Sequence, residues 1–196
     1  MAGRKSQNTR GKIISAAWKL FYDNGYDDTT VEDIVFESGT SKGSFYHYFP
    51  GKEALVGTLA YVFDEKYEEL EKEIDNSTDT ITRLAWLNHE LFAMIESSVS
   101  IDLLSRLLAG QLISRGEKHL LDRHREYFRL LRKLITEGQK KGEIRTDMSA
   151  GDISKAYAMW ERALMYDWCL CSGDYSLTDY TDKMTPDFLN NFRSSK

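Results

Sequence analysis

The amino-acid sequence predicts an all-α protein of about nine helices, divided between a small N-terminal domain and a larger helical domain. Apolar residues recur about every 3.6 positions along most of the chain. Only two prolines interrupt the 196 residues, and hydrophobic residues make up 41% of them, enough for a buried core. We expect a three-helix domain with a helix-turn-helix over residues 1–52 and the larger domain over residues 53–196.

The first helix is expected over residues 9–24, where Ile13, Ala17 and Phe21 form an apolar stripe and Gly25 follows as the stop. A short second helix begins after Thr30, a good N-cap residue, and Asp33 stands where a capping box needs an acidic side chain. These two helices form the first half of the small domain.

The turn and the third helix follow directly. Gly39 can adopt the left-handed conformation that a sharp turn needs, and Ser41 can cap a helix over residues 42–48. Pro50 and Gly51 end that helix. Two short helices joined by a turn that contains glycine have the spacing of a helix-turn-helix.

The larger domain is expected to hold the remaining helices. One long helix over residues 52–74 would join the two domains and act as a lever. Others are expected over residues 81–97, 101–114 and 118–141, and from Ser149 onward. Thr185-Pro186-Asp187 is typical of a helix start, so a ninth short helix is expected over residues 188–192.

The third helix presents two different faces. Phe45, Tyr48 and Phe49 are expected to face inward. The opposite face gathers small, hydrogen-bonding or cationic residues, namely Lys42, Gly43, Ser44, Tyr46 and His47. Such a face suits a DNA groove, although a small helical hairpin with a solvated face would show the same pattern.

The segment resembles the DNA-binding part of the TetR family of bacterial transcriptional regulators. The runs T-V-E-D-I and S-G-T-S-K-G-S-F-Y-H-Y-F-P-G-K-E-A-L carry the resemblance, which covers about the first 60 residues. Thr40 departs from it, because the family usually has an apolar residue there, and Phe36-Glu37 is bulkier than usual. The resemblance implies a homodimeric regulator, expected to be a repressor that a small-molecule effector releases from a palindromic operator.

The resemblance also implies roles for individual residues. Phosphate contacts are expected from Thr30, Ser41, Tyr46 and Lys52, with an added contact from the Thr40 hydroxyl. Base-edge contacts are expected from Lys42, Ser44 and His47, and Gly43 would allow close approach. The basic arm before residue 9 would either touch the duplex or be disordered.

The resemblance further implies an effector pocket in the larger domain. Four candidate lining residues are Trp86, Glu90, Tyr127 and Trp160, each of which could instead belong to the core. The eighth and ninth helices are expected to form the dimer contact. Control by a protein partner, or by a thiol switch at Cys169 and Cys171, is an alternative, and so is a helical binding module without a DNA role.

Charge and motif content bound the function further. Residues 1–52 hold seven Lys and Arg against six Asp and Glu, a net charge of +1. Because the whole chain has a net charge of −5, the remaining residues carry −6. The four histidines are scattered, and no Gly-rich phosphate loop, nucleophile elbow or zinc spacing occurs, so neither an enzyme nor a metal or cofactor site is expected. No membrane-length apolar run or secretory signal occurs, which favours a cytoplasmic protein.

Overall fold

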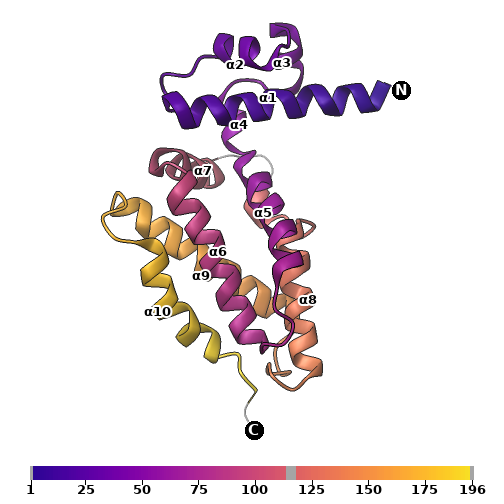
Figure 1. The fold of residues 1–196 in the computed structure, drawn as a ribbon, viewed down its shortest axis with the longest axis vertical. Helices are drawn as coiled ribbons and strands as arrows, with labels where there is room; N and C mark the ends of the chain where they lie inside the picture. Colours follow the sequence, from indigo (N-terminus) through magenta and orange to yellow (C-terminus); the bar gives the residue numbers. More distant parts are fainter. Residues whose placement is uncertain (1, 114–117, 195–196) are drawn as a thin grey trace.

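The computed structural model describes residues 2–113 and 118–194, and all regular elements in these residues are helices except for one isolated β-bridge between Ile144 and Arg193. Figure 1 shows a small headpiece of α1, α2 and α3 above a larger body, with α4 between them. The elements are α1 (Ala2–Asn24), α2 (Val31–Ser38), α3 (Lys42–Tyr48), α4 (Glu53–Val56), α5 (Leu59–Glu73), α6 (Thr80–Ser98), α7 (Ile101–Ile113), the 3₁₀-helix η1 (His119–Leu121), α8 (Glu126–Lys140), α9 (Ala150–Leu170) and α10 (Leu177–Asn190).

The headpiece forms as the sequence predicts. Thr30 and Asp33 make a complete capping box at the start of α2. Gly39 ends α2 with a φ of 61°, and its N–H reaches the carbonyls of Phe36 and Val35. The first helix is longer than expected, because α1 begins at Ala2 and so includes the expected arm. The three helices share one apolar core, made by Ile13, Ala17, Phe21, Ile34, Phe45 and Phe49.

The helix expected over residues 52–74 is instead two helices, which is a correction. The helix is interrupted at Gly57 and Thr58, between α4 and α5. The Thr58 hydroxyl donates to the Leu55 carbonyl at 2.6 Å and accepts from Trp18 Nε1 at 2.9 Å. A serine or threonine hydroxyl that bonds a preceding carbonyl favours a bend, and here it also ties the bend to α1. The joint between headpiece and body is therefore a bend rather than a rigid rod.

The body packs around α6, which lies against α10, α5 and α8 (Figure 1). The helix expected over residues 118–141 is also interrupted, because Arg125 turns inward and α8 begins only after it. None of the helices in the described ranges is long and apolar enough to span a bilayer. The buried centre of the body includes Leu84, Leu87, Leu91, Phe92, Ile95, Leu131, Ile135 and Tyr157.

The last helix starts well before the position that the sequence predicts, so that prediction was wrong. α10 begins at Leu177, where the Ser176 hydroxyl accepts from the Asp179 N–H at 3.2 Å. Pro186 lies inside the helix rather than at its first turn. Extensive packing of α10 against α6 compensates for the backbone hydrogen bond that proline cannot donate.

Candidate DNA-binding surface and effector pocket

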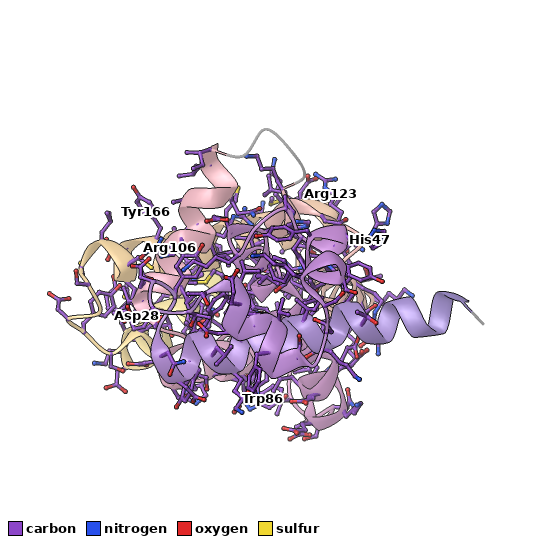
Figure 2. All side chains as sticks on the ribbon, turned by 90° about the horizontal axis from the view of Figure 1, so that it is seen from above. Asp28, His47, Trp86, Arg106, Arg123 and Tyr166 are labelled. Atoms are coloured by element: carbon purple, nitrogen blue, oxygen red, sulfur yellow. The ribbon has the colours of Figure 1, made fainter. Side chains whose placement is uncertain are left out.

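The exposed face of α3 carries most of the predicted DNA-contacting residues. Phe45 is fully buried and fixes the helix against α1, while Tyr46 and His47 are exposed. Figure 2, which looks down on the headpiece, shows His47 projecting from its edge. The Ser41 hydroxyl caps the helix by accepting from the Ser44 N–H at 3.1 Å. The arrangement leaves a short, exposed, hydrogen-bonding surface that matches the size of a major groove.

Several predicted contacts already have partners within the headpiece. Lys42 forms an exposed ion pair with Glu32 of α2. The Thr30 hydroxyl donates to Asp33 Oδ2 at 2.6 Å, and these hydrogen bonds from Thr30 lower the pKa of Asp33. Thr40 shares a hydrogen bond of 2.7 Å with the Ser38 hydroxyl. An exposed ion pair such as that of Lys42 contributes little to stability, so a phosphate or base can replace it at small cost.

Lys52 has a different position from the one expected. Its ammonium donates to three backbone carbonyls of the loop between α1 and α2, those of Tyr26 at 2.7 Å, Thr29 at 2.9 Å and Asp27 at 3.2 Å. It also lies 4.4 Å from the centre of the Tyr26 ring. Because an ammonium has only three N–H donors, a phosphate contact by Lys52 would need to replace at least one of these hydrogen bonds.

A second region of interest is a buried pocket between α5, η1, α8 and α9. Its volume is about 30 Å³, room for one or two water molecules. Apolar side chains form much of its wall, and polar groups form the remainder. The lining residues are Phe63, Tyr67, Leu91, Leu120, Arg125, Tyr127, Ala158, Glu161, Arg162 and Met165.

Glu161 is the centre of a hydrogen-bonded network at this pocket and is 2% exposed. Its carboxyl group accepts from the Tyr127 hydroxyl at 2.6 Å, from Asn88 Nδ2 at 3.2 Å and from the Tyr67 hydroxyl at 3.3 Å. Burial raises the pKa of Glu161 although these hydrogen bonds oppose the rise. The sequence analysis missed this residue. A usable signal was its position between Tyr157 and Leu164 on the apolar stripe of α9.

A buried ion pair borders the same pocket. Arg125 Nε donates to Asp64 Oδ2 at 2.8 Å, and Arg125 Nη2 donates to the Ala60 carbonyl at 2.6 Å. Asp64 Oδ1 also accepts from the Tyr127 N–H at 3.2 Å, at the start of α8. The pair therefore joins α5 to α8 on one side of the cavity.

Comparison with known proteins identifies the family. A sequence model of bacterial regulatory proteins of the tetR family matches residues 13–59. The HTH-type transcriptional regulator YuxN of Bacillus subtilis is 46% identical over 59 residues, which are 30% of this chain but only 20% of that protein. The HTH-type transcriptional repressor DhaR of Mycobacterium sp. (strain GP1) is 26% identical over 171 residues, 80% of each chain. The N-terminal domain of the chain therefore belongs to the TetR family.

Solved structures of similar fold cover most of the chain. FadR of Bacillus subtilis, solved with stearoyl-CoA, has a TM-score of 0.66 at 20% identity and covers 92% of this chain and 97% of its own. FadR of Thermus thermophilus, a TetR-family repressor solved with lauroyl-CoA, has a TM-score of 0.69 at 21% identity and covers 92% of each chain. The sequence relatives are transcriptional regulators, which agrees with the expectation of a DNA-binding regulator rather than an enzyme.

The structure brings only one of the four predicted effector residues into the pocket around Glu161. Tyr127 lines it, whereas Trp86 and Glu90 do not and remain half-buried on α6. Arg123 precedes the pocket residue Arg125 by two positions. In Figure 2 Trp86 lies toward one edge of the view and Arg123 toward the opposite edge.

Trp160, the fourth predicted effector residue, packs away from this pocket. Its ring stacks on Phe188 of α10 at 4.7 Å between centroids, and its Nε1 donates to Thr185 Oγ1 at 3.2 Å. The Trp160 side chain therefore packs between α9 and α10, as the alternative of a core role predicts.

Proposed function

We propose that this TetR-family regulator is a homodimeric repressor that leaves a palindromic operator when a small molecule with an apolar chain enters the pocket around Glu161. The observation that carries the proposal is a continuous set of contacts from this pocket to the joint below the headpiece. An effector that changes the joint would change the distance between the two α3 helices of a dimer.

The contacts run through η1. Leu120 lines the pocket, and its neighbour His119 reaches the bend between α4 and α5. A Cβ atom placed on Gly57 would lie 3.4 Å from His119 Cδ2, so the ring covers the side of the bend where a side chain at position 57 would point. The His119 ring is also 6.1 Å from the Tyr61 ring of α5. Displacement of Leu120 by a ligand would therefore move the group that packs on the bend.

A second connection holds the headpiece to α7. Arg106 donates to Asp27 at 2.8 Å and lies 4.4 Å from the centre of the Tyr26 ring. Both contacts meet the loop that Lys52 also holds. The headpiece is therefore attached to the body at two places, and movement of either place would tilt α3.

The proposed dimer contact lies on α9 and α10, as the family pattern implies. Large apolar side chains on these helices are exposed in the single chain, and apolar patches of this kind usually mark contact surfaces. A twofold contact here would pair equivalent surfaces. The residues are Tyr166 and Leu170 on α9 and Tyr180 and Met184 on α10.

Long-chain acyl-CoA is the first effector class to test. The two FadR structures hold stearoyl-CoA and lauroyl-CoA, and the pocket of this chain has an apolar wall of Phe63, Leu91 and Met165. A volume of about 30 Å³ holds no acyl chain, so binding must widen the pocket. That requirement supports a ligand-driven change of shape rather than binding to a preformed cavity.

Thiol control has less support. Burial is the largest cause of the raised pKa of both Cys169 and Cys171, which disfavours the reactive thiolate at neutral pH. Ligand control therefore has the stronger physical basis.

The proposal is tested with the dimer and a labelled DNA fragment from upstream of its own gene. Palmitoyl-CoA should lower DNA binding in a fluorescence anisotropy titration and should raise the melting temperature as its concentration increases. Unchanged DNA binding at saturating palmitoyl-CoA, together with an unchanged melting temperature, would contradict it. Absence of any binding to the upstream DNA would favour the helical module without a DNA role.

A matched pair of glycine variants tests the route through η1. Gly57→Val places a side chain against His119, whereas Gly110→Val in α7 adds one where no atom lies within 4 Å. We expect Gly57→Val to bind palmitoyl-CoA but to show an altered release of DNA, and Gly110→Val to behave as the wild type. Equal release in the two variants would exclude the η1 route.

A further inference from the structure

A surface groove adjoins the pocket around Glu161. It lies between η1, α8 and α9, has a volume of about 240 Å³, and shares Ala158 and Arg162 with the pocket. Leu121, Phe128 and Met159 give the groove an apolar side. A molecule in the groove could therefore extend past Ala158 into the pocket without leaving an apolar surface.

The other side of the groove is strongly cationic. Arg123, Arg132, Lys155 and Arg162 all line it. None of these four makes an ion pair within 4.0 Å to an acidic residue in the part of the chain that the structure describes. Arg132 Nη2 donates to the Arg123 carbonyl at 3.0 Å, which fixes these two residues beside each other.

The positive charge of this groove contrasts with the net charge of the whole protein, which is −5. Like charges that share a concave surface repel one another and attract an anion. Guanidinium groups are suited to phosphate because their planar donors can form two parallel hydrogen bonds. The groove therefore fits a ligand part with several negative charges better than a neutral one.

The buried acid sets the direction of such a ligand. Glu161 lies at the inner pocket, where burial raises its pKa, and within the described part of the chain no ion pair joins it to a cation. Arg125, which lines the inner pocket together with Arg162, is already paired with Asp64, so an anionic group pushed inward would be desolvated beside the Glu161 carboxyl group. The apolar end of the ligand should therefore enter the pocket and the charged end should stay among the four cations.

We propose that Arg123, Arg132, Lys155 and Arg162 form a phosphate-binding subsite for the head of an amphipathic effector whose apolar chain enters the pocket around Glu161. The inference rests on the proposed function and adds the chemical class of the ligand: a chain-bearing molecule with a phosphorylated head, as opposed to a free fatty acid. Arg162 joins the two parts, because it lines both cavities.

The experiment measures dissociation constants for palmitoyl-CoA, palmitate and CoA without a chain, by calorimetry on the intact dimer. The test variant is Arg132→Gln with Lys155→Gln. The matched control, Lys140→Gln with Lys141→Gln, removes the same charge at exposed positions outside the groove. We expect the test variant to bind palmitoyl-CoA about ten- to a hundredfold more weakly, as for lost hydrogen bonds to charged groups, and palmitate unchanged. The control should match the wild type.

Four results would overturn the inference. Equal affinity of the wild type for palmitoyl-CoA and palmitate, unaffected by the test variant, would leave the proposed function intact and remove the subsite. Equal affinity for CoA and palmitoyl-CoA would show that the chain plays no part. A test variant that is monomeric by sedimentation would assign the cations to the subunit contact. If no ligand binds at all, the proposed function fails together with the subsite.

Discussion

Removal of one partner from the buried pair of Arg125 and Asp64 should destabilise the body strongly. Their side chains are only 7% and 12% exposed. In Arg125→Met, Asp64 would keep the Tyr127 N–H but lose the cation that pairs with it among the described residues, and the Ala60 carbonyl would lose the hydrogen bond from Arg125. The uncompensated carboxylate at the contact of α5 with α8 is the main source of the expected loss.

The expected loss of stability depends on the unpaired charge that remains when one partner is removed. Removing one member of a buried ion pair costs about 3–5 kcal/mol. For a protein near 200 residues, each kcal/mol shifts the melting temperature by about 2–4 °C, so Arg125→Met should melt about 6–20 °C lower. Replacing both partners, with Arg125→Met and Asp64→Leu, leaves no buried charge and should recover most of the loss.

Urea unfolding followed by circular dichroism, at one fixed protein concentration, gives the required free energies. The wild type, both single variants and the double variant are compared in a thermodynamic cycle. A single-variant loss below about 1 kcal/mol would refute the reasoning, because it would place the pair in the range of exposed ion pairs. A double variant that is no more stable than the singles would show that the pair itself, rather than an orphaned charge, holds α5 to α8.

Three further predictions concern single residues. Burial raises the pKa of Glu161 in the folded protein above its ordinary value of 4.5. The free energy of unfolding should therefore fall as pH rises from about 4.5 through the folded pKa. Glu161→Gln should lose this pH dependence when urea midpoints are compared across pH. Lys52→Met should lower the free energy of unfolding by about 1.5–3 kcal/mol, whereas weaker operator binding at unchanged stability would restore Lys52 as a phosphate contact. Thr30→Ala should lower the free energy of unfolding by about 0.5–2 kcal/mol in a urea titration, because the cap of α2 is lost. His47→Ala, at an exposed position, should weaken operator binding and change the free energy of unfolding by no more than about 0.5 kcal/mol. The reverse pattern would contradict both roles.

The sequence by itself determined the headpiece. The capping box of Thr30 and Asp33, the left-handed Gly39 and the Ser41 cap are local features, since each depends on residues at most four or five positions apart. The face of α3 follows from the same short-range periodicity. Local hydrogen bonds and backbone preferences act without knowledge of the rest of the chain, which explains why these expectations match the structure.

Only the tertiary structure decided the body and its pocket. The ammonium of Lys52 meets carbonyls 23 to 26 positions away, and Glu161 meets Asn88 and Tyr67 at separations of 73 and 94. The stacking of Trp160 on Phe188 likewise depends on how two helices cross. Helical periodicity states which face is buried but not which helix covers it. The polar groups that share a pocket are therefore fixed by packing between distant segments, whereas the caps and turns are fixed by the chain nearby.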